Sequence, residues 1–386
     1  MLVMKRLFIL IFIFYGCSLT SPLKKGRLIS LYHLIEIGKY KDAKVVAEEL
    51  IEREESSQWA NAWYARGYLC QKAYGEGIRK NNPKLYELYP NQLYVTWESF
   101  EKARTFDSGE RMERQLAPKY VLLANDFQNL GIKQFENEKY NESLRAFEHA
   151  LQIEQLPFLS LNQDTLLTYN TALAAYESKN WKKAVKYLAR LHSMRFSENA
   201  THLLFKANLS MGDSNAAERV LFEGIGFYED HEKLVFLLTE FLFNDNRSDE
   251  ALAVIQMAIS EDPDNARYYY NKGLIYQKTS QYHKAIEAYT ESNNIDPDFL
   301  MTFANMATCY YNIGVAYEES TLKLSSNQAV KKERARSKNA FKSALFWLDG
   351  AIAKQTEDAE VISKLSELYI ALGKTDKTKL PVMDNE

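Results

Sequence analysis

The sequence has little of the residues that build turn-rich or disulfide-bonded folds. Its 386 residues include only 15 glycines, 8 prolines and 3 cysteines. So few glycines and prolines argue against a β protein, whose many tight turns depend on these two residues. Three cysteines, Cys17, Cys70 and Cys309, make no disulfide framework, and we expect no structural disulfide.

An excess of positive charge is also missing. The formal net charge is −3 at pH 7, with 48 basic and 51 acidic residues. Binding to nucleic acid depends on basic residues that neutralise phosphates, so we expect no nucleic-acid partner.

Motifs for catalysis and metal binding are absent from the sequence. The six histidines are scattered, without an HExxH spacing and without cysteines near pairs of them. The short glycine pairs at 75–77 and 224–226 follow no predicted strand, and no Ser, Cys or Lys stands in a nucleophile motif. We therefore predict a protein that is not an enzyme and that needs no cofactor and no metal.

The first seventeen residues are typical of an export signal. Lys5 and Arg6 precede a short apolar run, Leu7 to Tyr15, that is too short to span a bilayer comfortably. Gly16 and Cys17 then resemble the end of a bacterial lipobox, in which the cysteine is lipidated after cleavage. We expect a signal peptide at 1–16, lipidation of Cys17 and a tether at 17–23. The alternatives are an ordinary signal peptide or an uncleaved anchor extending to Leu23.

The rest of the chain repeats itself. Units with helix-like apolar spacing begin near 165, 198, 232, 266 and 300, in steps of 33, 34, 34 and 34 residues. Within residues 266–299, small residues stand where two helices must approach, and large aromatic residues alternate with them. The positions that carry this pattern are Tyr269, Gly273, Tyr276, Ala285, Tyr289 and Pro297.

This pattern resembles the tetratricopeptide repeat, whose signature has an aromatic, glycine, tyrosine, alanine, aromatic and proline in these places. The resemblance covers roughly residues 24–371 and implies an all-α fold, a right-handed superhelical solenoid of helical pairs. One such unit cannot bury its own apolar face, so neighbouring units are required.

Two insertions interrupt the predicted solenoid, near 76–91 and 313–338, and a flexible tail is expected at 372–386. The second insertion carries a local charge of +4 between 331 and 338. It favours two lengthened helices with a solvated face, or else a docking site for an acidic partner or a phospholipid headgroup. A last helix, 359–371, resembles a capping element.

The resemblance also implies where a partner would bind. In tetratricopeptide proteins the concave groove is lined by the first helix of each repeat. The corresponding positions in this sequence are Tyr64, Tyr68, Asn129, Phe135, Tyr169, Asn170, Tyr176, Lys206, Phe236, Phe243, Tyr270, Asn271, Asn305 and Tyr311. Aromatic rings would give contact area, and Asn side chains can pair with a peptide backbone. Any one of these residues could instead pack against a neighbouring helix.

We therefore expect a non-catalytic scaffold or adaptor, tethered by lipid to a bacterial membrane, that binds a protein or peptide at the cell envelope. The alternative is a lipoprotein that captures carbohydrate, because Tyr and Phe rings also suit sugar faces. The basic residues with which some family members hold a terminal carboxylate are missing, so that function is not expected.

Overall fold

The computed structural model describes residues 22–107, 109–159, 164–353 and 370. Over these residues the chain is helical, with one short 3-10 helix, η1 (Pro157–Leu159), and no β-strand. In chain order the α-helices are α1 (Pro22–Glu36), α2 (Tyr40–Glu52), α3 (Ala60–Arg79), α4 (Pro83–Tyr86), α5 (Gln92–Phe106), α6 (Glu110–Glu136), α7 (Tyr140–Glu154), α8 (Thr165–Glu177), α9 (Trp181–Ser193), α10 (Glu198–Ser210), α11 (Ser214–Ile225), α12 (Glu232–Asn244), α13 (Ser248–Glu261), α14 (Ala266–Lys278), α15 (Tyr282–Ile295), α16 (Leu300–Thr321) and α17 (Asn327–Ala353). The prediction of an all-α solenoid is confirmed, whereas its handedness stays a prediction.

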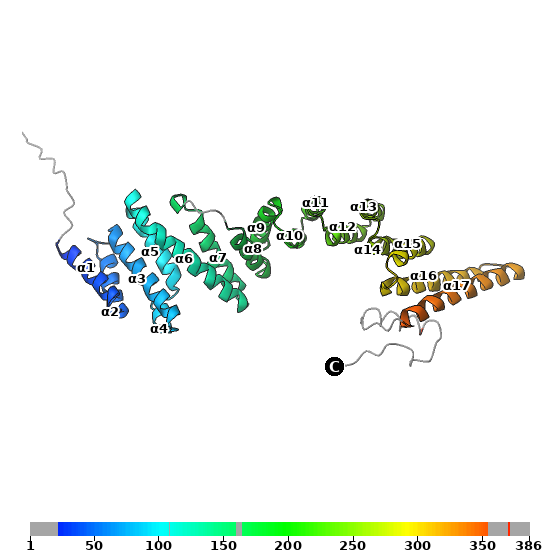
Figure 1. The fold of residues 1–386 in the computed structure, drawn as a ribbon, viewed down its shortest axis with the longest axis horizontal. Coiled ribbons are helices and arrows are strands. Elements are labelled where there is room, and N and C mark those ends of the chain that lie inside the picture. Colours follow the sequence, from blue (N-terminus) through cyan, green and yellow to red (C-terminus); the bar gives the residue numbers. More distant parts are fainter. Residues whose placement is uncertain (1–21, 108, 160–163, 354–369, 371–386) are drawn as a thin grey trace, which may run out of the picture. The chain divides into compact units, whose positions relative to one another are not determined.

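The helices pack as consecutive hairpins. The paired helices are α1 with α2, α3 with α5, α6 with α7, α10 with α11, α12 with α13, α14 with α15, and α16 with α17. Neighbouring hairpins inside a unit also touch, as α2 does α3 and α15 does α16. Contacts divide the chain into two compact units, 1–187 and 188–386. Figure 1 shows the hairpins of the first unit in blue to green and those of the second in green to orange.

Five helices begin at the predicted repeat starts. They are α8 at Thr165, α10 at Glu198, α12 at Glu232, α14 at Ala266 and α16 at Leu300. A side chain just before the helix accepts hydrogen bonds from free backbone N–H groups at several of these starts. Asp164 Oδ1 accepts from the N–H of Leu166 at 2.8 Å, and Asn265 Oδ1 accepts from Arg267 N–H at 3.1 Å. The starts were predictable because the same local signals recur at a fixed period.

The turns inside the hairpins share one backbone feature. Two residues after α1 and α10, Gly38 and Gly212 adopt a left-handed conformation, with φ of 75° and 79°. Non-glycine residues hold the corresponding place after α8, α12 and α14, namely Lys179, Asn246 and Ser280. A left-handed residue there ends a helix and reverses the chain toward the second helix.

Close approach within the hairpins depends on glycine. A Cβ atom built on Gly67 would lie 2.4 Å from the Phe100 ring, and one built on Gly131 would lie 2.5 Å from the Phe147 ring. Each aromatic ring of the second helix therefore occupies the space that a side chain on the first helix would need. This packing explains why small and large residues alternate in the sequence.

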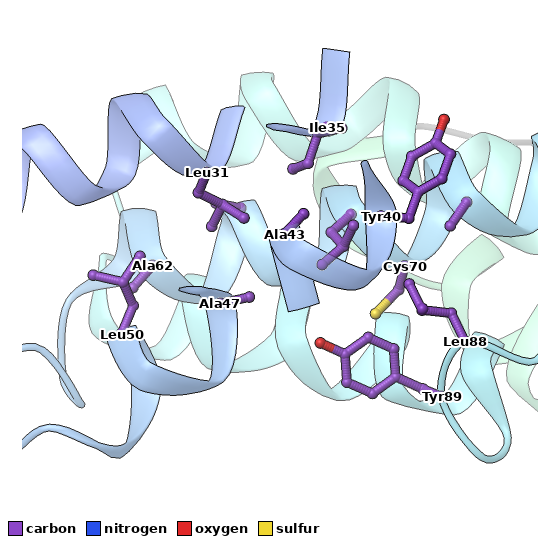
Figure 2. Close-up of a cluster of buried hydrophobic side chains, with 13 residues drawn as sticks. Leu31, Ile35, Tyr40, Ala43, Ala47, Leu50, Ala62, Cys70, Leu88 and Tyr89 are labelled. Carbon is purple, nitrogen blue, oxygen red and sulfur yellow. The ribbon is translucent and has the colours of Figure 1, made fainter. Parts of the chain in front are cut away.

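The insertion near 76–91 is folded into the core of the first unit. Helix α3 continues to Arg79, beyond the predicted start of the insertion, and α4 follows. Leu88 and Tyr89 are buried among residues of α1, α2 and α3, beside Cys70 (Figure 2). These two side chains of the insertion belong to the core, because their apolar area is buried against the preceding helices.

Helix α6 is one uninterrupted helix of 27 residues. Pro118 lies inside α6, although proline usually breaks helices because it lacks an N–H and its ring crowds the preceding turn. Buried Leu116, Tyr120 and Leu123 around it hold both halves of α6 against neighbouring helices.

At the second insertion, α16 continues to Thr321 and α17 begins at Asn327, and the two lie alongside each other (Figure 1). The prediction of two lengthened helices with a short loop is confirmed. The signal peptide at 1–16, Cys17, most of the tether, the tail and, apart from Ile370, the predicted cap at 359–371 lie outside the described residues. In the part of the chain that is described, no helix combines the length and apolarity that crossing a bilayer requires.

Candidate functional site

A pocket of about 970 Å³ lies in the first unit, next to the insertion. Its lining comes from the end of α3, the segment that includes α4, the start of α5, and the facing sides of α6 and α7. Tyrosines from three of these segments line it: Tyr74, Tyr86, Tyr89 and Tyr94. This size and mixed lining are typical of ligand sites in proteins.

Local hydrogen bonds hold the wall that the insertion contributes. The Gln92 side chain donates to the carbonyl oxygens of Cys70 at 2.8 Å and Leu85 at 3.1 Å, and it accepts from the backbone N–H of Tyr89 at 3.1 Å. The Lys44 ammonium donates to the carbonyl oxygen of Leu88 at 2.8 Å. Satisfied buried polar groups of this kind fix a segment that would otherwise be a mobile loop.

Tyr89 connects this wall to a partly buried ion pair. Its hydroxyl donates to Glu48 Oε1 at 2.7 Å, and Arg66 Nε donates to the same oxygen at 2.8 Å. Burial and the neighbouring Glu48 carboxylate both raise the pKa of Tyr89, so its hydroxyl stays protonated. The wall of the pocket is thereby held to α2 and α3.

Asp126 on α6 is the unusual group of the pocket. It is partly buried, and burial raises the pKa of its carboxyl to about 6. Burial, together with the charge of Asp126, raises the pKa of Tyr74 to about 12. Among the described residues, none donates a hydrogen bond to the Asp126 side chain or forms an ion pair with it.

Charged side chains at the edge of the pocket are exposed. The Arg145 guanidinium lies over the Tyr94 ring, 4.1 Å from its centroid. Glu142, Lys133 and Glu87 also line the pocket and are exposed to solvent. Carboxylates and cations therefore surround a partly buried, tyrosine-rich interior.

The predicted groove residues of the first unit have different surroundings. Asn129 is exposed and lines the pocket. Phe135 packs against the Tyr140 ring with centroids 5.1 Å apart, and Tyr176 packs against Trp181 at 5.3 Å. Tyr169 and Asn170 are partly buried on α8.

Tyr68, also predicted for the groove, is partly buried. Its hydroxyl donates to Glu36 Oε1 at 3.0 Å, and Lys119 Nζ lies 4.5 Å from its ring centroid. Through these contacts Tyr68 joins α3 to α1 and α6, so its side chain lies between neighbouring hairpins.

In the second unit, Lys206 is exposed near His202, whose pKa falls to about 4 because of burial and of the nearby Lys233 and Lys206 charges. Phe236 packs against Tyr268, with centroids 5.9 Å apart. Lys278 Nζ lies 5.0 Å from the ring centroid of Phe243.

The other predicted groove residues of this unit contact their own neighbours. Asn271 Nδ2 donates to the carbonyl oxygen of Arg267 at 2.8 Å. Tyr270 packs against Phe299, with centroids 4.8 Å apart, and Tyr311 packs against Phe341 at 5.7 Å. A single strip that joins residues of both units stays a prediction.

Two of the predicted groove residues are buried, and for them the prediction was wrong. Tyr64 is 7% exposed and packs between Tyr68 and Phe100, and Asn305 is 0% exposed. Asn305 Nδ2 donates to the Tyr270 hydroxyl at 2.9 Å. Both side chains face a neighbouring helix, which is the alternative that the sequence left open.

Sequence reasoning missed four residues of the pocket: Asp126, Tyr74, Tyr94 and Arg145. Each occupies an ordinary position in an amphipathic helix, and residues of the insertion supply another wall of the pocket that they line. The one available signal was the insertion itself, since insertions in repeat proteins often lie near binding surfaces. In the described residues, no group of His, Cys, Asp and Glu is arranged to hold a metal ion.

Comparisons with known proteins agree on the repeat. Residues 266–299 match the family model of the tetratricopeptide repeat. No curated protein matches the sequence.

Solved structures of repeat proteins resemble the chain at low sequence identity. A TPR repeats protein from Bacteroides fragilis is 19% identical, with 64% of this chain and 98% of that chain covered and a TM-score of 0.34. The C-terminal part of a TPR repeat-containing protein from Cytophaga hutchinsonii is 14% identical, with 64% and 96% covered and a TM-score of 0.38. The TPR2AB domain of yeast Sti1, in its pHSP90 complex, is 17% identical, with 65% and 99% covered and a TM-score of 0.28.

All three TM-scores are below 0.5, so these structures carry nothing about what this chain binds. The repeat itself rests on the chain's own features: consecutive helical hairpins, starts spaced by 33 or 34 residues, and glycines that receive aromatic rings. Residues 266–299 match the tetratricopeptide repeat, and these features show an array of hairpins of the same kind on either side of that match.

Proposed function

We propose that this protein is a non-catalytic adaptor that holds a segment of a partner protein in the pocket beside the insertion. The tetratricopeptide fold is a protein-interaction scaffold, and function in such folds belongs to sites on the array rather than to the array itself. The observation that carries the proposal is the pocket of about 970 Å³, which the insertion adds to the array and which its own hydrogen bonds hold open.

The lining suits a polypeptide. Partly buried tyrosines offer contact area with few rotamers to order. The exposed Asn129 and the half-buried Gln134 can pair with a backbone. We further propose that Cys17 carries a lipid anchor, so that the adaptor works at a bacterial membrane. The basis for this is the sequence of residues 1–17. No observation favours carbohydrate as the bound partner.

Site-specific photocrosslinking in the cells that produce the protein tests the proposal. A benzophenone amino acid at Asn129, which is exposed in the pocket, should form an adduct with a defined partner protein. The same probe at Glu240, exposed on α12 in the second unit, is the matched control. The proposal fails if the Asn129 probe gives no protein adduct, or if both probes give the same adducts.

A further inference from the structure

Asp126 differs from the other shielded carboxylates of the first unit in its lack of a partner. Glu48 accepts hydrogen bonds from Arg66 and Tyr89, and Glu101 accepts from Arg104 at 2.8 Å and Tyr120 at 2.6 Å. Asp126 has no such donor among the described residues. Burying a carboxylate without a partner is unfavourable, so such groups are seldom left unpaired unless they are used.

The groups around Asp126 suit a cation. Tyr74 from α3, Tyr86 from α4 and Tyr94 from α5 line the same pocket. Tyrosine faces attract ammonium and guanidinium groups, and a carboxylate adds a charge-assisted hydrogen bond. One such contact already exists at the edge of the pocket, where the Arg145 guanidinium lies 4.1 Å from the Tyr94 ring centroid.

The pocket's own cations do not neutralise Asp126. Lys133 and Arg145 are exposed, and neither forms an ion pair with it. Glu87 and Glu142 add further negative charge to the lining. An anionic ligand placed against Asp126 would be repelled, whereas a cation would relieve the desolvation of its carboxylate.

We propose that Asp126 receives a lysine or arginine side chain of the partner polypeptide, which enters the pocket among Tyr74, Tyr86 and Tyr94. This inference rests on the proposed adaptor function and names the chemistry that the adaptor recognises. A polypeptide is the source because the pocket, at about 970 Å³, is much larger than one basic side chain, and residues flanking that side chain fill the rest.

Fluorescence anisotropy with the full chain tests this. The probes are labelled peptide pools with random flanks and one fixed central residue: lysine, arginine, acetyl-lysine or norleucine. We expect the lysine or arginine pool to bind at least about tenfold more tightly than either neutral pool, because the neutral side chains lose the charge-assisted contact. Asp126→Asn should abolish this preference and Asp126→Glu should retain part of it.

Asp349→Asn is the matched control, because Asp349 is an exposed helical aspartate in the second unit. It removes the same charge and should leave the preference unchanged. A thermal unfolding curve for each variant shows that the chain remains folded.

Each other outcome overturns the inference and locates the error. If all four pools bind alike, or if Asp126→Asn keeps the preference, the cation site is wrong while crosslinking at Asn129 can still uphold the adaptor function. If free butylammonium binds and no peptide pool does, the ligand is a small amine and not a polypeptide. If nothing binds and Asn129 gives no adduct, both proposals fail.

Discussion

A Cβ atom on Gly273 would lie 2.5 Å from Cε1 of Tyr289, the buried ring that faces it from α15. The Tyr289 hydroxyl donates to Gln277 Oε1 at 2.7 Å, so the ring is held at both its face and its end. Gly67 with Phe100, Gly131 with Phe147, and Gly314 with Phe341 repeat the relationship in three other hairpins. A missing side chain on the first helix thus sets how closely the second helix approaches.

Gly273→Ala should therefore destabilise the α14–α15 hairpin by about 1–3 kcal/mol, because the new methyl group overpacks the contact with Tyr289. Denaturant unfolding measures the loss, and hydrogen exchange should show it near α14 and α15. Gly75→Ala is the control. Gly75 lies inside α3 with nothing within 4 Å of its Cβ position, and alanine there should be neutral or slightly stabilising. Equal losses at both sites would contradict the packing argument.

His192 joins three helices of the second unit. Its Nδ1 lies 2.9 Å from Thr201 Oγ1 on α10, and its Nε2 lies 3.0 Å from Glu223 Oε2 on α11. Replacing His192 by Ala should cost about 1–3 kcal/mol, since buried Thr201 loses a hydrogen-bond partner and the ring leaves a space. His283→Ala, at an exposed histidine, should cost much less in the same unfolding experiment. Similar midpoints for the two variants would show that the network contributes nothing.

Asp126→Asn should make the protein more stable near neutral pH. Burial raises the carboxyl pKa from 3.8 to about 6, so the folded state binds the proton more tightly than the unfolded state does. The wild type therefore has its full stability below about pH 4 and loses part of it as pH rises through about 6. Near pH 7.5 the Asn variant should gain on the order of 2 kcal/mol, and near pH 4 it should gain little.

Thermal unfolding of both proteins across this pH range measures the difference. A gain that does not depend on pH would show that the charge of Asp126 is not the cause. Asp349→Asn should give no such pH-dependent gain, because Asp349 is exposed.

Asn305→Ala separates a core residue from a groove residue. Asn305 is 0% exposed and donates to the Tyr270 hydroxyl, so its loss should lower stability by about 1–2 kcal/mol. Crosslinking at Asn129 should be unchanged, because the two residues belong to different units. Loss of the crosslink without loss of stability would restore Asn305 as a binding residue.

Cys17→Ser tests the proposed anchor. If Cys17 is lipidated, the variant should move from the membrane fraction to the soluble fraction, or remain unprocessed at a larger size. Cys70→Ser is a matched control, because that cysteine is buried inside the array. Membrane association of the Cys17 variant at unchanged size would overturn the anchor.

Where the repeat is regular, its period was enough to predict where the helices begin. The starts of α8, α10, α12, α14 and α16 followed from spacing alone, because each unit reuses the same caps, glycines and aromatic rings. Where the repeat is irregular, the spacing of residues does not predict the bounds or the packing of the helices. The extent of α6 depends on tertiary contacts around Pro118, and the fold of the insertion depends on contacts between Leu88 and helices far away in the sequence.

The candidate site was harder to predict for a related reason. Asn129 was predicted from its slot in the repeat, but Asp126 lies one helical turn earlier at a position that has no role in the repeat pattern. Asp126 stands out because it is partly buried in a pocket, and residues of the insertion help to form that pocket. Tyr64 and Asn305 show the opposite case. The repeat pattern predicted both for the groove, but their side chains are buried between helices.

The continuity of α6 limits how this protein can vary in length. Buried Leu116 and Tyr120 fix one half of the helix, and Asp126 faces the pocket from the other half. Adding or removing one residue between Tyr120 and Asp126 would turn Asp126 by about 100° around the helix axis, away from the pocket. Related proteins that keep the pocket should therefore have no gap within α6 between these two residues.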